Sequence, residues 1–156
     1  MADIFEKSQL KPGQMRTVAD RRYDDAEYLR KSELNRHANG VYYLGGFVLE
    51  CLLKAQMLEK FPELRKPPSD PAKLTPEQTH RFNLVYRWHN LKALLVELPE
   101  LTARLDKSDR SQRLSKNLTR LCDRWTIFAR YSPHQAMMKE ASQFLLQIKE
   151  LKKWLT

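Results

Sequence analysis

The chain has 156 residues, the size of one domain, and it can bury a single core without disulfides or metal. Its formal net charge of +9 and its pI near 9.7 favour an anionic partner, with nucleic acid first, an acidic protein second and a membrane surface third. The N-terminal stretch lacks the apolar core of a signal peptide, and the longest apolar run is shorter than a membrane span. We therefore expect a cytoplasmic protein with no membrane partner.

Helical periodicity dominates the sequence and predicts an all-α fold, an up-and-down bundle of four to five helices in one domain over residues 1–156. Residues 1–14 are expected to be flexible. The first helix is predicted over residues 15–32 and the second over residues 33–61. Five of the eight prolines follow closely, so residues 62–79 are predicted to form a long proline-rich loop.

Three more helices are predicted in the second half of the chain. The third begins near His80 or after His89, and Pro99 ends or kinks it. The fourth is predicted over residues 108–131 and the fifth over residues 132–154. The fifth has the start signal of a capping box, with a serine cap, proline in the first position and glutamine in the third: Ser132, Pro133 and Gln135.

The fourth predicted helix separates into two faces when its residues are placed at 100° steps. One face is apolar: Leu114, Leu118, Leu121, Trp125 and Phe128. The opposite face has four cations and a tyrosine with no carboxylate between them: Arg113, Lys116, Arg120, Arg124 and Tyr131. Such a strip can follow the phosphate backbone of a nucleic acid. The alternative is an ordinary solvated face.

Metal and cofactor chemistry have little support in the sequence. Only Glu77 and His80 have the spacing of a helical di-iron half-site, and there is no HExxH, CxxC or phosphate-binding glycine motif. We therefore expect neither a metal nor a cofactor. Cys51 and Cys122 both lie in apolar helical patterns, which favours buried free thiols in a reducing compartment.

The segment GGFVLECLLK combines two features that weaken a buried helix. Gly45 and Gly46 lower its intrinsic stability, although they allow another backbone to come close. Glu50 and Lys54 form an acid-first pair four residues apart among apolar neighbours. A buried pair stabilises little because desolvation offsets attraction, so we expect it to hold another helix or to belong to a site.

Three segments of the chain resemble HEPN domains, small helical bundles found in prokaryotic defence and toxin systems. They are YYLGGFVLECLLKAQM, which contains Glu50, Cys51 and Lys54, then HNLKALL beginning at His89, and WTIFARYSP beginning at Trp125. The resemblance covers most of the chain from about Ala19 onward. It implies an α-helical bundle that binds RNA or nucleotides.

The resemblance also implies an activity. Many HEPN proteins are metal-independent ribonucleases that use an arginine followed by a histidine, with two copies of the motif meeting in a homodimer. The corresponding residues here are Arg130 and His134, with three residues between them. A histidine can take the proton of a ribose 2′-hydroxyl, and an arginine can hold the phosphate. The implied protein is a cytoplasmic endoribonuclease of a toxin–antitoxin type system.

Two alternatives remain open at this point. Other HEPN proteins resemble non-catalytic partners of minimal nucleotidyltransferases. In such a module Glu50, Lys54 and Arg130 would form a polar cluster, and the basic face would meet an acidic partner. The second alternative is a structural helical protein whose charge serves solubility. We expect His89 to have a structural role at the edge of the core, the alternative being a place beside Glu50.

Overall fold

The computed structural model describes residues 9–109 and 112–156, and every regular element in them is a helix. The predicted all-α class is therefore confirmed, with more helices than predicted. The seven α-helices are α1 (Pro12–Lys31), α2 (Ala38–Lys60), α3 (Pro76–Tyr86), α4 (Leu91–Val96), α5 (Pro99–Ser108), α6 (Arg113–Arg124) and α7 (Met138–Leu155). Four short 3-10 helices join them: η1 (Asn35–His37), η2 (Pro62–Arg65), η3 (Pro71–Lys73) and η4 (Ile127–Tyr131).

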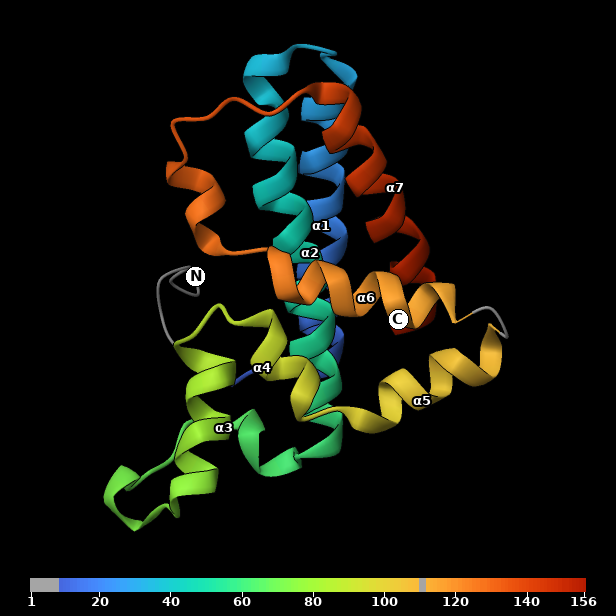
Figure 1. Ribbon diagram of the computed structural model, residues 1–156. Helices are drawn as coiled ribbons and strands as arrows, with labels where there is room; N and C mark the ends of the chain where they lie inside the picture. The colour runs from blue at the N-terminus through green and yellow to red at the C-terminus, as the bar shows by residue number, and fades with distance from the viewer. Residues whose placement is uncertain (1–8, 110–111) are drawn as a thin grey trace.

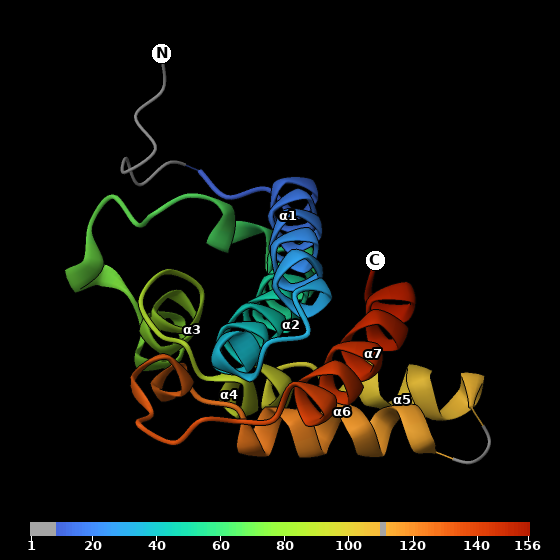
Figure 2. The same ribbon diagram turned by 90° about the horizontal axis from the view of Figure 1, so that it is seen from above.

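The core is built around α2, which lies against α1 and α7 (Figures 1 and 2). Fourteen of its 23 residues are buried, more than an amphipathic surface helix would bury. α6 lies across these helices and packs on α4, α5 and α7. The stretch Asn35–Lys60 is long and apolar enough to cross a membrane, contrary to our expectation, but 72% of its most apolar window is buried inside the protein.

The N-terminal half departs from prediction at its boundaries. Residues 1–8, expected to be flexible, lie outside the described residues, and α1 already begins at Pro12. The proline-rich segment contains η2, η3 and the start of α3, where Thr75 and Gln78 form a capping box. The segment is also tied to the core, because Leu64 is buried and its carbonyl accepts a hydrogen bond of 2.7 Å from the Tyr86 hydroxyl.

The fourth predicted helix is shorter than expected at both ends. Residue 108 is the last residue of α5, and α6 begins at Arg113 and ends at Arg124. Trp125 has extended backbone angles (φ −72°, ψ 134°) and ends the helix. As a result, Phe128 does not continue the apolar face: it lies in η4 and is 69% exposed. Tyr131 does not continue the basic face either, since it is the last residue of η4.

The last helix begins later than predicted. α7 begins at Met138, so Ser132, Pro133 and Gln135 lie in the preceding connection and do not cap it. The Ser132 hydroxyl instead accepts a hydrogen bond of 3.3 Å from the backbone N–H of His134. Serine hydroxyls make this kind of local hydrogen bond both in turns and at helix starts. The predicted helix start at Ser132 is therefore wrong, and the same residues form a local turn.

Candidate functional site

The glycine pair of α2 makes room for two aromatic rings. A Cβ atom at Gly46 would overlap the indole of Trp125, and one at Gly45 would lie 2.5 Å from Cε1 of Phe144. The Trp125 indole N–H donates a hydrogen bond of 2.9 Å to the carbonyl oxygen of Tyr42 on the same helix. The glycines therefore cost helix propensity but fix Trp125 and Phe144 against α2. The predicted close approach is made by side chains, not by a second backbone.

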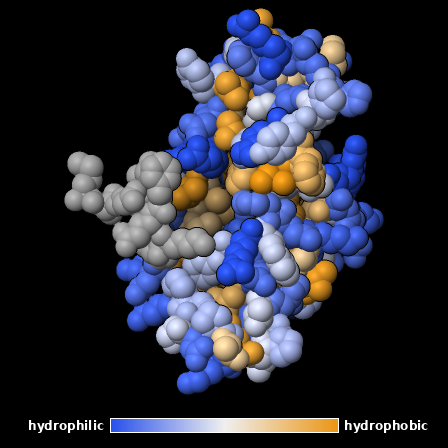
Figure 3. Space-filling view, turned by 90° about the vertical axis from the view of Figure 1, so that its left-hand side faces the viewer, coloured by the Kyte–Doolittle hydropathy of each residue, from blue (hydrophilic) through white to orange (hydrophobic). Residues whose placement is uncertain are grey.

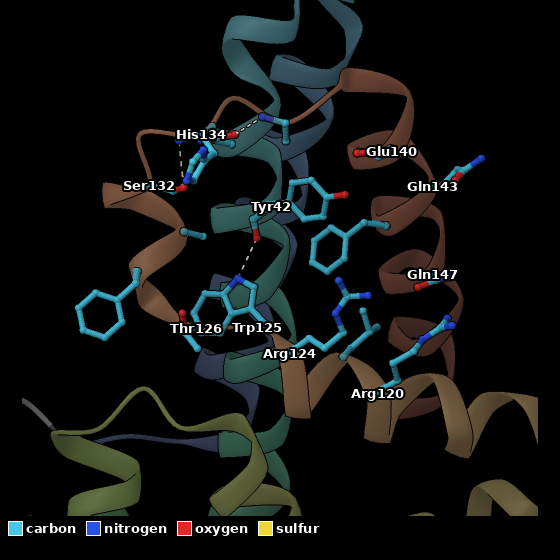
Figure 4. Close-up of a pocket in the computed structure, with 16 residues that line it drawn as sticks. Tyr42, Arg120, Arg124, Trp125, Thr126, Ser132, His134, Glu140, Gln143 and Gln147 are labelled. Carbon is cyan, nitrogen blue, oxygen red and sulfur yellow. Dashed lines mark hydrogen bonds between the residues drawn. The ribbon is translucent and has the colours of Figure 1, made fainter.

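An open cleft of about 660 Å³ lies beside these rings, between α2, α6, η4 and α7 (Figure 4). Its walls combine rings and polar groups. The rings are Tyr42, Trp125, Phe128 and Phe144. The charged or polar groups include Asn39, Arg120, Arg124, Ser132, His134 and Glu140. Ligand sites are usually hollows in which apolar rings are combined with convergent polar groups, and this cleft has both.

Two cations of the predicted basic face enter the cleft. Arg120 and Arg124 project from α6 toward α2 and α7 (Figure 4). Arg120 donates a hydrogen bond of 3.1 Å to the side chain of Asn117, and within residues 9–109 and 112–156 Arg124 makes no hydrogen bond or ion pair. Burial raises the pKa of Tyr42, the Glu140 carboxylate adds to this rise and Arg124 opposes it. Positive charge and a carboxylate thus both face this ring.

The rest of the basic face is divided. Lys116 is exposed and lines a second, more open hollow on α6, which Arg120 and Arg124 also line. Arg113 is instead paired with Glu150 of α7, with Nη1 2.7 Å from a carboxylate oxygen. The carboxylate missing from this face of α6 is therefore supplied by another helix at one end of the strip. The predicted strip is reduced to Lys116, Arg120 and Arg124.

His134 lies at the opposite rim of the cleft from Arg120 (Figure 4). Asn39 of α2 fixes its loop from both sides. The side-chain N–H of Asn39 donates a hydrogen bond of 2.8 Å to the His134 carbonyl oxygen. The side-chain oxygen of Asn39 accepts a hydrogen bond of 2.8 Å from the backbone N–H of Ala136. The amide thus sets the position of the His134 backbone. Neither Asn39 nor Tyr42 was identified from the sequence, because nothing local marks a residue that meets a loop 95 positions away.

Arg130 points to a different place. It does not line the cleft. Its guanidinium donates a hydrogen bond of 3.1 Å to the Tyr43 hydroxyl and another to the Tyr131 hydroxyl. It also lies over both rings, 5.5 Å from the Tyr43 centroid and 4.5 Å from the Tyr131 centroid. Arg130 and His134 make no hydrogen bond with one another in the described part of the chain.

The buried charges of α2 form a second cluster with His89. Glu50 is 2% exposed and Lys54 7%, and the Lys54 ammonium is 2.6 Å from Oε1 of Glu50. Nδ1 of His89 lies 3.0 and 3.1 Å from the two oxygens of the same carboxylate. The pair was expected to hold another helix or to belong to a site, and its further partner is a residue of the connection between α3 and α4. His89 takes the place beside Glu50, which was the alternative to a purely structural role.

The three segments that carry the family resemblance meet at one point of the fold. The Phe47 ring lies 5.4 Å from the His89 ring, 5.6 Å from Trp125 and 4.9 Å from Tyr43, and Tyr43 holds Arg130. Tyr43, Phe47 and Glu50 follow one face of α2 at steps of four and three residues, a signal that could have predicted the row.

Residues 9–109 and 112–156 contain neither a reactive thiol nor a group of side chains that could hold a metal ion. Cys51 and Cys122 are buried and free, as predicted. Burial raises the pKa of each thiol to about 12, so neither is a thiolate near neutral pH. Across the same residues, no three His, Cys, Asp or Glu side chains gather as a metal-binding group.

Comparison of the chain with known proteins gave no match, whether to a protein-family model, to a characterised protein or to a solved structure.

Proposed function

We propose that this protein is a HEPN-like, up-and-down helical bundle that binds RNA or nucleotide phosphate in the cleft between α6 and α7. The observation that carries the proposal is the position of Arg120 and Arg124, two cations without carboxylate partners in the described chain that enter a hollow lined by aromatic rings. Arginines hold phosphates, and rings stack on bases. The net charge of +9 is consistent with such a polyanionic partner.

The family resemblance extends this proposal to metal-independent RNA cleavage within a cytoplasmic defence or toxin–antitoxin type system. In that reaction His134, at the rim of the cleft, takes the proton of a ribose 2′-hydroxyl. Arg130 stabilises the charge that develops on the phosphate. The products are a 2′,3′-cyclic phosphate and a 5′-hydroxyl. A homodimer would bring a second copy of Arg130 and His134 to the same substrate.

Binding is tested first, by fluorescence anisotropy with a labelled single-stranded RNA. Arg120→Ala/Arg124→Ala should weaken binding and make the slope of log K against log salt shallower by roughly 1.4, since each phosphate contact on a single strand contributes about 0.7. Lys73→Ala/Lys107→Ala is the matched control, because it removes the same charge from exposed positions outside the cleft. Equal losses in both double variants would mean non-specific attraction and would contradict a site in the cleft.

Cleavage is tested separately on the same RNA, with EDTA present throughout. Wild type should produce cyclic-phosphate ends, and Arg130→Ala and His134→Ala should each reduce the rate. Absence of cleavage by wild type would end the nuclease part of the proposal and leave binding to be judged by anisotropy.

The second candidate is a non-catalytic HEPN module that partners a minimal nucleotidyltransferase. One observation favours it: Arg130 is engaged by Tyr43 and Tyr131 and does not reach the cleft where His134 lies. In that case the exposed cations of α6 meet an acidic partner chain. RNA binding that is unaffected by Arg120→Ala/Arg124→Ala, together with absence of cleavage, would favour this candidate.

A further inference from the structure

We propose that the cleft selects an unpaired guanine of the bound RNA strand, and that Glu140 is the residue that determines this specificity. The inference rests on the function proposed above, since it names the base that the cleft takes. In this arrangement Arg120 and Arg124 hold the phosphate of one nucleotide, and the Glu140 carboxylate accepts hydrogen bonds from the edge of its base.

Opposite charges line the cleft without pairing. Arg124 projects from α6 and Glu140 from the first turn of α7 (Figure 4). In the described part of the chain, neither the Arg124 guanidinium nor the Glu140 carboxylate makes a hydrogen bond or an ion pair. The same two helices do form such a pair elsewhere, between Arg113 and Glu150. The two charges of the cleft therefore remain available to a ligand that meets both.

An aromatic ring lies between these charges. Figure 4 shows Tyr42 between Arg124 and Glu140, and its ring centroid is 4.8 Å from that of Phe144. Burial raises the pKa of Tyr42, the Glu140 carboxylate raises it further and Arg124 lowers it, so both charges act on the same hydroxyl. Bases stack on such rings. A base beside Tyr42 has a cation toward α6 and a carboxylate toward the start of α7.

The wall that α7 contributes has the length of one nucleotide. Glu140, Gln143 and Gln147 line the cleft at steps of three and four residues, the spacing of one helix face. At about 1.5 Å per residue, Glu140 and Gln147 are about 10 Å apart along the axis. Figure 4 places Gln147 toward Arg120 and Glu140 at the far end. A nucleotide has a similar length from its 5′-phosphate to the edge of its base, so one nucleotide can reach both ends.

The carboxylate determines which base fits, because an ionised carboxylate accepts hydrogen bonds and donates none. Among the four RNA bases, only guanine has two neighbouring donors on its Watson–Crick edge, N1–H and the 2-amino group. Adenine and cytosine have a donor beside an acceptor, and uracil has one donor between two acceptors. The other three bases therefore place an acceptor against a carboxylate oxygen. Since this edge is free only in an unpaired base, the ligand is a single strand.

The rim of the cleft also suits a single strand. Phe128 lines the cleft from η4 and is 69% exposed, so a neighbouring unpaired base can stack on it. Figure 3 looks at the side of the molecule that carries η4, where apolar surface gathers at mid-height among hydrophilic residues. His134 belongs to the same rim. The selected guanine thus lies close to the position of the proposed cleavage.

The decisive experiment measures the anisotropy of labelled uridine decamers whose central base is guanine, inosine, adenine, cytosine or uracil. Their 2′-hydroxyls are replaced by fluorine, so they lack the nucleophile for cleavage. Wild type should bind the guanine decamer roughly 10-fold more tightly than the adenine, cytosine and uracil decamers. Inosine lacks the 2-amino group and should fall between them.

Glu140→Gln should remove the difference between guanine and inosine and bring both to the level of the other bases. The other three decamers should bind as well as to wild type or better, because a negative charge near the phosphate is lost. Glu33→Gln is the matched control, since it neutralises an exposed carboxylate outside the cleft, and it should keep the guanine preference. A guanine preference that persists in Glu140→Gln would overturn the inference.

The remaining outcomes separate a failed inference from a failed function. Equal affinity of wild type for all five decamers, with weaker binding in Arg120→Ala/Arg124→Ala, overturns the inference alone, whereas no binding of any decamer overturns both proposals. A lower melting temperature of Glu140→Gln with an unchanged ratio of guanine to inosine affinity would mean that Glu140 only stabilises the start of α7. Unlabelled 5′-GMP should displace the guanine decamer only far above the Kd of the decamer. Displacement near that Kd would make a free nucleotide the ligand and overturn the assignment to RNA.

Discussion

Two ion pairs in this protein share one sequence pattern but lie in opposite surroundings. Glu50 and Lys54 on α2 are four residues apart, 2.6 Å from each other, with side chains 3% and 8% exposed. Glu77 and Arg81 on α3 have the same spacing and order and a distance of 2.5 Å, but their side chains are 68% and 21% exposed. Spacing therefore predicts that each pair forms and does not predict what the pair costs.

The difference lies in water and in the third partner. In the exposed pair the Glu77 carboxylate keeps most of its hydration, and Arg81 gains a second carboxylate, Glu97, at 2.9 Å. The buried pair has lost its hydration, so each charge depends on the other. Its additional contact is a half-exposed histidine. The buried pair therefore differs from the exposed pair both in its desolvation cost and in the surface histidine that it contacts.

The largest expected effect comes from removing one partner of the buried pair. Lys54→Ala leaves the Glu50 carboxylate without its cation in a dry environment, and should lower the free energy of unfolding by about 3–5 kcal/mol. Urea unfolding followed by circular dichroism measures this loss. A loss below about 1 kcal/mol, the range of surface pairs, would contradict the description of Glu50 as a buried charge that depends on Lys54.

Removing both partners should have a very different result. In Glu50→Met/Lys54→Met no charge is left unpaired and the packing volume is largely kept. The free energy of unfolding should equal that of wild type or exceed it by up to about 4 kcal/mol. The same urea experiment measures it, with Lys54→Ala as the reference. A double variant as unstable as Lys54→Ala would show that the pair itself stabilises the fold.

The fold could be predicted from the sequence where local signals agree with tertiary packing. The apolar face of α6 is correct at Leu114, Leu118 and Leu121, which are all buried. The prediction fails after Arg124, because Trp125 leaves the helix to place its indole in the hollow at Gly46. Helix periodicity contains no information on that distant hollow, so both η4 and the late start of α7 were missed.

The candidate site was predicted to a similar extent. Glu50 and Lys54 could be singled out because charges in an apolar helix are conspicuous, and His89 because it begins a segment that resembles HEPN domains. The grouping of Arg130 with His134 followed the arginine–histidine motif that the resemblance to HEPN domains implies. In the structure the two residues belong to different surroundings, since Arg130 lies on Tyr43 and His134 in the cleft. Only the folded chain brings His89 to the aromatic row that ends at Arg130.

The next effect concerns Cys51, beside Glu50 in the same buried stretch. Burial raises the pKa of its thiol from 9.0 to about 12, and the Glu50 carboxylate adds to the rise. A folded-state pKa above the unfolded value means that this stabilisation is complete below about pH 9 and is lost as the pH rises toward the folded pKa. At about pH 10 the thiol ionises in the unfolded chain but not in the folded one, which should lower the free energy of unfolding of the wild type by roughly 1 kcal/mol.

The variant Cys51→Ala isolates that contribution, since all other titrating groups are unchanged. The difference in free energy of unfolding between wild type and Cys51→Ala should therefore shrink from neutral pH to about pH 10. Urea unfolding at a series of pH values measures it. Two parallel pH curves would show that the Cys51 environment does not penalise the thiolate, and would weaken the description of the stretch around Glu50 as dry.

The smallest effect is expected at the exposed pair, and it decides whether burial is the true difference. Glu77→Gln keeps the size of the side chain and removes its charge, while Arg81 keeps Glu97 as a partner. Because solvent screens this pair, losing its charge together with a carboxylate at a helix start should lower the free energy of unfolding by less than about 1 kcal/mol. High salt should reduce that loss further. Urea midpoints at low and high salt measure both. If Glu77→Gln were as damaging as Lys54→Ala, desolvation could not be what separates the two pairs.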